Sequence, residues 1–159
     1  MSDNQEPDES IRVARLTDPH RALGAAVEYL QGDPTFDRQP FGTWSRILLG
    51  QISREHYAFA LRERKPVGFV GFGRTTQDVI RRWEVDGQRP SNAECREGPY
   101  FVINAWKADD RAVSLAMKSW LARQHRDATA LFAERFYPDG RSKIIRRYSP
   151  RADADLRTL

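Results

Sequence analysis

The chain has 159 residues, of which 40% are hydrophobic and 30% are charged, with a formal net charge of +4 and an isoelectric point near 9.5. This composition is typical of a single soluble globular domain and excludes a disordered or fibrous chain. No apolar run approaches the roughly 18–20 residues that a membrane-spanning helix requires. The one cysteine, Cys95, excludes an internal disulfide and a cysteine-based structural zinc site.

The first predicted elements are two helices joined by a loop. Asp18-Pro19 is typical of a helix start, and apolar residues at helical spacing continue to Gly32. Residues 41–52 have the spacing of a second amphipathic helix, whose apolar face includes Phe41 and Trp44. Between them, GDPTFDRQPF (residues 32–41) is too polar and too proline-broken for a helix or strand, and it predicts a surface loop.

A β-hairpin follows. Residues 56–73 form two apolar arms around a charged turn at residues 62–65. Thr75 or Thr76 then opens a short helix, in a pattern that resembles a capping box. Residues 86–98 are predicted as a loop.

The last third of the chain contains the central strand. PYFVINAW (residues 99–106) is an apolar run of strand length, which predicts burial on both faces. A helix with an acidic first turn follows it, and ATALFAERFY and SKIIRRYS predict two strands around a Pro138-Asp139-Gly140 turn. The whole pattern predicts one mixed α/β domain over residues 11–150, with tails at residues 1–10 and 151–159.

The two ends of the chain differ in charge. The first ten residues are acidic and polar, unlike a secretory signal, so we predict a disordered tail and a cytoplasmic protein. The basic residues near the other end are Arg135, Arg141, Lys143, Arg146, Arg147 and Arg151. Such a run favours a nucleic acid, a membrane surface or an acidic protein as partner, and it equally fits an ordinary solvated face.

Local catalytic motifs are missing. The sequence has no P-loop, no GxGxxG after a strand, no GxSxG and no HExxH, and it predicts no metal site. The three histidines, His20, His56 and His125, do not cluster, and each is predicted to have a surface or structural role. Arg96 would lower the pKa of the neighbouring Cys95, but nothing nearby identifies this cysteine as a nucleophile.

The junction from Trp106 to Arg111 joins the central strand to a helix. A helix N-terminus presents free backbone N–H groups, and ligands gather at strand ends in open α/β sheets. An anionic or carbonyl oxygen at this junction would lie near the basic side chains of Lys107 and Arg111. The alternative is a routine helix start, in which Asp109 and Asp110 satisfy these N–H groups.

Three stretches resemble the toxin-activating lysine acyltransferases, the hemolysin C-type proteins that attach fatty acyl groups to RTX toxins. LGAAVEYLQGDPTFDRQPF is similar to the family's leading helix and loop, HYAFALRERKPVGFVGFGRTT to its hairpin, and GPYFVINAWKADDRAVSLAMKSWL to its strand and following helix. The resemblance covers roughly residues 23–135. It implies a GNAT-like α/β fold with a central mixed sheet flanked by helices. It also implies acyl carrier protein as the acyl donor, a protein lysine as the acceptor, and no bound cofactor.

The resemblance further implies a catalytic histidine in the loop and an aspartate on the central strand. An imidazole can take the proton of the acceptor lysine, and a carboxylate can orient that imidazole. In this chain the histidine position falls on Phe36, and the aspartate position falls at Ile103, beside Asn104. The family's "APFG" after the strand is replaced by WKADD.

Two hypotheses follow from these differences. In the first, Asp33 or Asp37 replaces the base and Asn104 orients it, although a carboxylate with a pKa near about 4 is a weak base for lysine. In the second, catalysis is lost, and Phe36 and Trp106 face an acyl chain, a pantetheine arm or a protein partner. Both place Asp33, Phe36 and Asp37 at a cleft. Asn104 and Trp106 are expected to face this cleft from the strand, and Lys107 and Arg111 to meet the phosphate of a pantetheine arm.

The sequence thus leaves three functions open. The first is an acyltransferase that uses acyl carrier protein, and the second is a non-catalytic relative that binds an acyl group, the carrier or another acidic protein. The third, nucleic-acid binding, rests on the C-terminal basic run alone, since no nucleic-acid motif accompanies it. A homodimer is a further association that the sequence allows.

Overall fold

The computed structural model describes residues 10–124, 126–137 and 139–148. Six strands form one sheet in the order β1-β2-β3-β4-β5-β6. The strands are β1 (Ile11–Ala14), β2 (Tyr57–Arg62), β3 (Lys65–Thr75), β4 (Tyr100–Ala108), β5 (Ala130–Phe136) and β6 (Ser142–Tyr148). Neighbouring strands are antiparallel, except that β4 and β5 are parallel and are joined through helix α5 (Arg111–Gln124).

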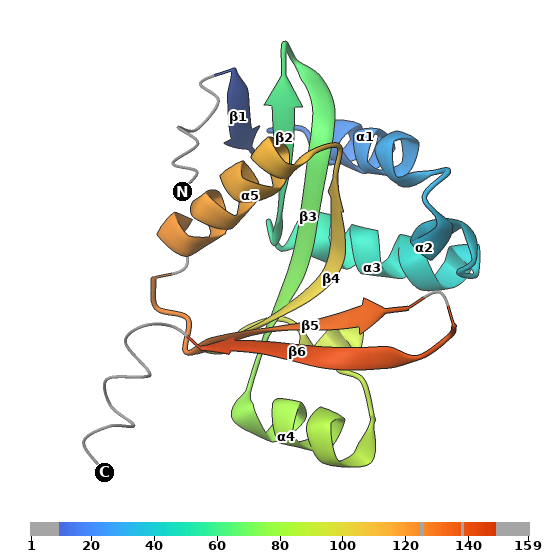
Figure 1. Ribbon diagram of the computed structural model, residues 1–159, viewed down its shortest axis with the longest axis vertical. Helices are drawn as coiled ribbons and strands as arrows, with labels where there is room; N and C mark the ends of the chain where they lie inside the picture. Colours follow the sequence, from blue (N-terminus) through green and yellow to red (C-terminus); the bar gives the residue numbers. More distant parts are fainter. Residues whose placement is uncertain (1–9, 125, 138, 149–159) are drawn as a thin grey trace, which may run out of the picture.

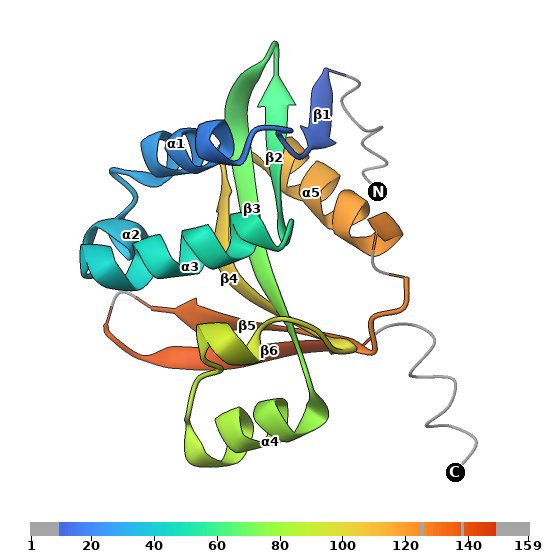
Figure 2. The ribbon, with the colours of Figure 1, turned by 180° about the vertical axis from the view of Figure 1, so that it is seen from behind.

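The helices lie in two layers. One face of the sheet carries α1 (Pro19–Leu30), the single turn α2 (Pro34–Asp37), α3 (Phe41–Ser53) and α4 (Gln77–Asp86), and the opposite face carries α5 (Figures 1 and 2). A short 3-10 turn, η1 (Asn92–Glu94), follows α4 and packs against α3 and β3. None of the described helices combines the length and the apolar character needed to cross a bilayer.

Side-chain alternation along β3 separates two core clusters. Phe69 packs toward α1 and α3, in a cluster with Leu30 and Leu48. Val70 and Phe72 project to the other face, where they meet buried residues of α5. Burial of these large side chains stabilises each layer by roughly 1.5–3 kcal/mol per side chain.

The helix starts follow from local sequence. The Asp18 side chain accepts hydrogen bonds from the backbone N–H groups of His20 and Arg21, at 2.9 and 3.2 Å, and Pro19 occupies the first turn, as predicted. Thr76 stands at the start of α4, but its side chain makes no capping hydrogen bond, so the predicted capping box is wrong. A capping box occurs instead between Ser91 and Glu94 of η1.

Three other expectations need correction. Residues 34–37 form a helical turn inside the predicted loop, because Asp33 caps it and Pro34 fits its first position. β1 was not predicted, and it pairs with β2 at the edge of the sheet. Phe41 was assigned to the buried face of α3 and is 72% exposed.

The remaining predicted helices and strands are confirmed, including a central β4 between β3 and β5. Residues 1–9 and 149–159 lie outside the described part, and with them lie the predicted tails except for Ser10. His125, Pro138 and Arg151 also fall outside it.

Candidate functional site

The parallel strands β4 and β5 separate halfway along their length. Their pairing runs from Tyr100↔Ala130 to Ile103↔Ala133 and then stops. Beyond that point β4 continues beside β3, while β5 continues beside β6. Figure 1 shows β4 curving up the sheet as β5 runs across it. We call the separated segments, residues 104–108 of β4 and 134–136 of β5, the fork.

A β-bulge begins the fork. Ile103 pairs with Phe72 and Ala105 pairs with Gly71, so Asn104 is an extra residue without a partner in β3. A bulge bends its strand and increases the local twist, which turns β4 away from β5. Because no described strand pairs with residues 104–108 on the β5 side, alternate peptide groups there are open to an extended, amide-bearing ligand.

Tyr29, Lys107 and Asp109 meet where β4 ends. The Lys107 ammonium donates a hydrogen bond to the Tyr29 carbonyl oxygen at 2.6 Å, and its Nζ lies 4.5 Å from the centre of the Tyr29 ring. The Tyr29 hydroxyl donates to Asp109 Oδ1 at 2.9 Å. Burial, and then the hydrogen bond to Asp109, raise the pKa of Tyr29, so this phenol stays protonated at neutral pH.

This network was missed by sequence reasoning. Tyr29 is 78 residues from Lys107 and 80 residues from Asp109, so no local spacing indicates the contact. In the structure the network fastens the last turn of α1 to the carboxyl end of β4. Lys107 binds the Tyr29 carbonyl in this network, and its expected contact with a phosphate stays a prediction.

The N-terminus of α5 is already occupied by a carboxylate. Asp110 Oδ1 accepts the backbone N–H of Val113 at 2.9 Å, and Asp110 Oδ2 accepts from the Arg62 guanidinium at 3.2 Å. The Val113 hydrogen bond, followed by the Arg62 contacts, holds the pKa of Asp110 below its ordinary value. The alternative of a routine capped helix is therefore the one observed, with Asp110 as the cap. Arg111 is exposed.

The predicted catalytic loop folds upon itself. Asp33 Oδ1 accepts the backbone N–H of Thr35 at 2.8 Å, and Asp37 Oδ1 accepts that of Gly32 at 2.9 Å. Phe36 is only 7% exposed and packs in the core cluster shared by α1 and α3. Its ring thus faces other side chains, and its predicted contact with a ligand would require α2 to move. A catalytic role for Asp33 or Asp37 stays a prediction.

The three predicted site residues on β4 lie on different surfaces. Asn104 is exposed at the bulge, so its side chain is accessible from the fork. Trp106 is half-buried against the cluster beneath α5, whereas Lys107 points to the face that carries α1. The structure therefore brings Asn104 to the fork but separates Trp106 from Lys107.

The other reactive groups lie away from the fork or are closed off. His20 is exposed, and its Nδ1 is 3.8 Å from Asp18 at the far end of α1. The ring of His56 stacks on Phe72. Cys95 is 2% exposed, and burial raises the pKa of its thiol. The expectation that Arg96 lowers this pKa is therefore wrong.

A surface hollow of about 500 Å³ lies between α4 and β6. It is crossed by a double hydrogen bond from Arg89 to Glu134, at 2.6 and 2.7 Å, and Arg146 pairs with Glu84 on its rim. These pairs fasten α4 to the β5–β6 hairpin. No group of three or more metal-binding side chains occurs among the described residues.

Comparison with protein-family models gives no match, and comparison with curated proteins gives none either. Solved structures do match. Drosophila melanogaster polyamine N-acetyltransferase aligns over 92% of this chain and 81% of its own, with 13% sequence identity and a TM-score of 0.57. The loading GNATL domain of CurA from Lyngbya majuscula aligns over 88% of this chain and 69% of its own, with 14% sequence identity and a TM-score of 0.55.

A third match is the GphF GNAT-like decarboxylase, which covers 80% of this chain and 67% of its own, at 19% identity and a TM-score of 0.50. The chain has the GNAT fold. This result confirms the predicted GNAT-like α/β domain with a mixed central sheet. Identities this low show the fold alone, so the narrower resemblance to toxin-activating lysine acyltransferases stays a prediction.

Proposed function

We propose that this chain binds an acyl-pantetheine thioester in the β4–β5 fork and transfers the acyl group from acyl carrier protein to a protein lysine. The observation that carries the proposal is the loss of pairing beyond Ile103 and Ala133, which leaves peptide groups of β4 open toward β5. Pantetheine is an extended chain with two amide groups, so it can hydrogen-bond to an open strand as an added strand does. The GphF structure is in complex with isobutyryl-CoA, a thioester of the same chemical class.

A carrier-bound donor fits the fork better than free acyl-CoA does. Coenzyme A carries a pyrophosphate, which helix N-termini commonly bind through free N–H groups. In this chain the α5 N-terminus is capped by Asp110, and Asp109 adds a second carboxylate beside it. The Asp110 cap occupies N–H groups that a pyrophosphate would use, and the Asp109 carboxylate repels it, whereas a carrier-borne arm has a single phosphodiester that stays with the carrier.

The transfer step requires an amine, a thioester and a place for one proton. The lysine nitrogen attacks the thioester carbonyl, the new C–N bond forms, the C–S bond breaks, and the departing thiolate takes up the proton that the amine loses. Backbone N–H groups of the open strand would stabilise the oxyanion that forms during attack.

His20 lies beside Asp18 at the far end of α1 from the fork, and the carboxylates of Asp33 and Asp37 accept backbone hydrogen bonds. We therefore propose that the acceptor lysine ammonium loses its first proton to solvent before the neutral amine attacks, and that the thiolate takes up the second. A free lysine has a pKa of about 10.4. As long as the pH stays below this value, the neutral fraction of the amine rises about tenfold for each unit by which the pH increases. We expect the initial rate of transfer to rise about tenfold from pH 7 to pH 8, as measured by mass spectrometry of the acceptor. A plateau at neutral pH would show that the protein supplies a base.

A second function is non-catalytic binding of the same donor. It is favoured by the engagement of Asp33 and Asp37 in backbone hydrogen bonds, because neither is left free to replace a base. In this case the fork would hold the arm, and no acyl group would reach a lysine at any pH.

One experiment separates the two functions. The protein is incubated with acyl carrier proteins bearing chains of several lengths and with a lysine-rich acceptor peptide. Intact-mass analysis detects transfer, and calorimetric titration measures binding. Asn104→Trp places a bulky side chain at the fork and should weaken binding at least tenfold, whereas Thr43→Trp, on the exposed face of α3, should not. Equal affinity of both variants and the wild type would contradict binding at the fork.

A further inference from the structure

The β5–β6 hairpin has one face that no described helix covers. The cross-strand pairs Leu131↔Arg147, Ala133↔Ile145 and Arg135↔Lys143 place these six side chains on one side. Leu131 packs against the cluster beneath α5, so this is the α5 side of the sheet. α5 makes its main contacts with β1 to β4, so it covers Leu131 but leaves Arg135, Lys143 and Arg147 exposed.

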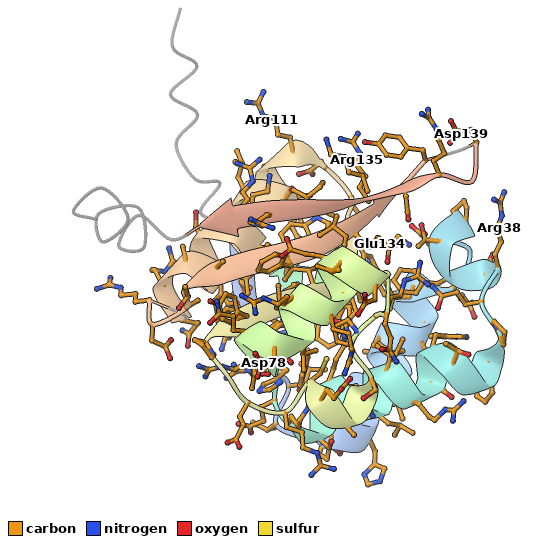
Figure 3. All side chains as sticks on the ribbon, turned by 90° about the horizontal axis from the view of Figure 1, so that it is seen from below. Arg38, Asp78, Arg111, Glu134, Arg135 and Asp139 are labelled. Carbon is orange, nitrogen blue, oxygen red and sulfur yellow. The ribbon has the colours of Figure 1, made fainter. Side chains whose placement is uncertain are left out.

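This open face is basic. Arg135, Lys143 and Arg147 are exposed, and Arg111 at the start of α5 lies on the same side of the sheet (Figure 3). Within residues 10–148, leaving aside positions 125 and 138, no ion pair joins these four cations to a carboxylate. Arg135 lies 5.3 Å from the ring of Tyr137, a contact that leaves its charge uncompensated.

The opposite face of the same hairpin is neutralised. Glu134 projects away from Arg135 toward α4 (Figure 3). There Glu134 pairs with Arg89, and on the same face Arg146 pairs with Glu84. The positive charge of the hairpin is thus concentrated on the α5 side. Solubility alone does not require the positive charges of the hairpin to lie on one face. A basic surface of this kind attracts acidic proteins.

The basic face has an apolar centre that leads to the fork. Ala133 and Ile145 are half-buried between Lys143 and Arg135 on one side and Arg147 on the other. Ala133 is also the last residue of β5 that pairs with β4, so the patch borders the point where the fork opens. An apolar centre with a charged rim is the usual anatomy of a protein interface.

We infer that this face, formed by Arg135, Lys143, Arg147 and Ile145, is the docking surface for an acidic carrier protein that delivers its acyl-pantetheine arm to the fork. The inference rests on the proposed function, since it places the surface on which the proposed carrier docks beside the same site. A carrier seated on the hairpin holds its arm next to Ala133, and charge complementarity speeds its encounter with the surface.

The test compares two charge reversals of equal size. Lys143→Glu/Arg147→Glu changes the docking face outside the fork, and Lys118→Glu/Arg123→Glu makes the same change on exposed positions of α5. Each variant and the wild type are titrated with dodecanoyl acyl carrier protein, with dodecanoyl-pantetheine and with a 20-base-pair DNA duplex. Circular dichroism confirms that the variants are folded.

The inference predicts that the hairpin variant binds the carrier at least tenfold more weakly and that the α5 variant stays within threefold of wild type. Pantetheine affinity should be equal in all three proteins. The inference is overturned if the carrier does not bind wild type, if both variants lose carrier affinity equally, or if only the DNA responds to the hairpin variant. Failure of dodecanoyl-pantetheine to bind wild type would instead overturn the proposed function, while carrier binding that depends on the hairpin would still support the surface.

Discussion

Gln51 is fully buried, and neither atom of its side-chain amide has a hydrogen-bond partner in the described part of the chain. It lies over Gly71, where an added Cβ would come within 2.1 Å of Gln51 Oε1. An unsatisfied buried polar group costs about 1–3 kcal/mol. We therefore expect Gln51→Met, which keeps the length of the side chain without its amide, to raise the free energy of unfolding by about 1 kcal/mol.

Urea denaturation of the two proteins measures this difference directly. A large loss of stability in Gln51→Met would contradict the expectation, because it would mean that the amide makes a favourable interaction in the folded protein. Gln51 could not be singled out from sequence, since its place on the inner face of α3 gives no sign that its amide lacks a partner.

The sequence also gave a mixed result for the site residues. Asn104 could be placed on the central strand from the apolar run around it, and it lies at the bulge of β4, while its role in catalysis stays a prediction. Phe36 could not be placed, because its burial depends on α2, a helical turn inside a segment that looked too polar to fold. Tyr29 was missed because its contacts are made only when α1 and β4 come together.

At the scale of elements, α5 approaches β3 closely at Gly68. A Cβ at this position would lie 2.6 Å from both Met117 Sδ and Val113 Cγ1, which is too close for the present packing. We expect Gly68→Ala to lower the free energy of unfolding by about 1–3 kcal/mol, as overpacking typically does. The matched control is Gly24→Ala on α1, where nothing lies within 4 Å and the better helix propensity of alanine should add about 0.5–1 kcal/mol.

Thermal and urea unfolding of both alanine variants test this packing. If Gly68→Ala were as stable as wild type, α5 would have to lie farther from the sheet than the structure places it.

The contact between α4 and the hairpin depends on pH. The Arg89 hydrogen bonds hold the pKa of Glu134 below its ordinary value, so the folded state favours the charged carboxylate. This stabilisation is fully present above pH ~4.3, the ordinary pKa of a glutamate. It is lost as the pH falls through the lowered pKa of the folded Glu134. Because Arg89 is 61% exposed, we expect Glu134→Gln to cost only about 0.5–1 kcal/mol at pH 7.

The same substitution should have almost no effect near pH 3, where the wild-type carboxylate is also losing its charge. Urea unfolding at the two pH values provides the comparison. An equal cost at both pH values would show that Glu134 stabilises the hairpin by packing rather than by its charge.

Most elements were predictable because their signals are local. The Asp18-Pro19 start of α1, the β2–β3 hairpin and the apolar β4 all follow from nearby residues. β1 was missed because it has only four residues and depends on β2 for its pairing. A capping box was predicted at Thr75 or Thr76, but the observed one begins at Ser91. The prediction failed because similar residue types occur at both helix starts.

At the scale of the whole molecule, the fork depends on register and could not be read from sequence. The apolar run of β4 gives no sign that pairing with β5 ends at Ile103. The bulge at Asn104 arises from the offset between β3 and β4, which are separated in sequence by α4 and η1. The fold class could still be predicted, because it depends on the order and spacing of the helices and strands and not on the exact register of strand pairing.

The acidic α5 N-terminus should also select between donors. Asp109→Asn removes one charge beside the α5 N-terminus while leaving the Asp110 cap in place. We expect this variant to bind dodecanoyl-CoA several-fold more tightly than wild type, with a smaller change for dodecanoyl-pantetheine, because only the former carries a pyrophosphate. Equal changes for the two ligands in calorimetric titration would show that Asp109 does not act through charge.

The most direct measurement is a nuclear magnetic resonance titration of the labelled protein with dodecanoyl-pantetheine, followed through its backbone amide signals. If the open edge of β4 holds the arm, the largest shifts will fall on residues 104–108 and 134–136, and the amides of Trp83 and Gly87 in the α4 hollow will stay in place. Shifts centred on that hollow, or none at millimolar ligand, would contradict the account.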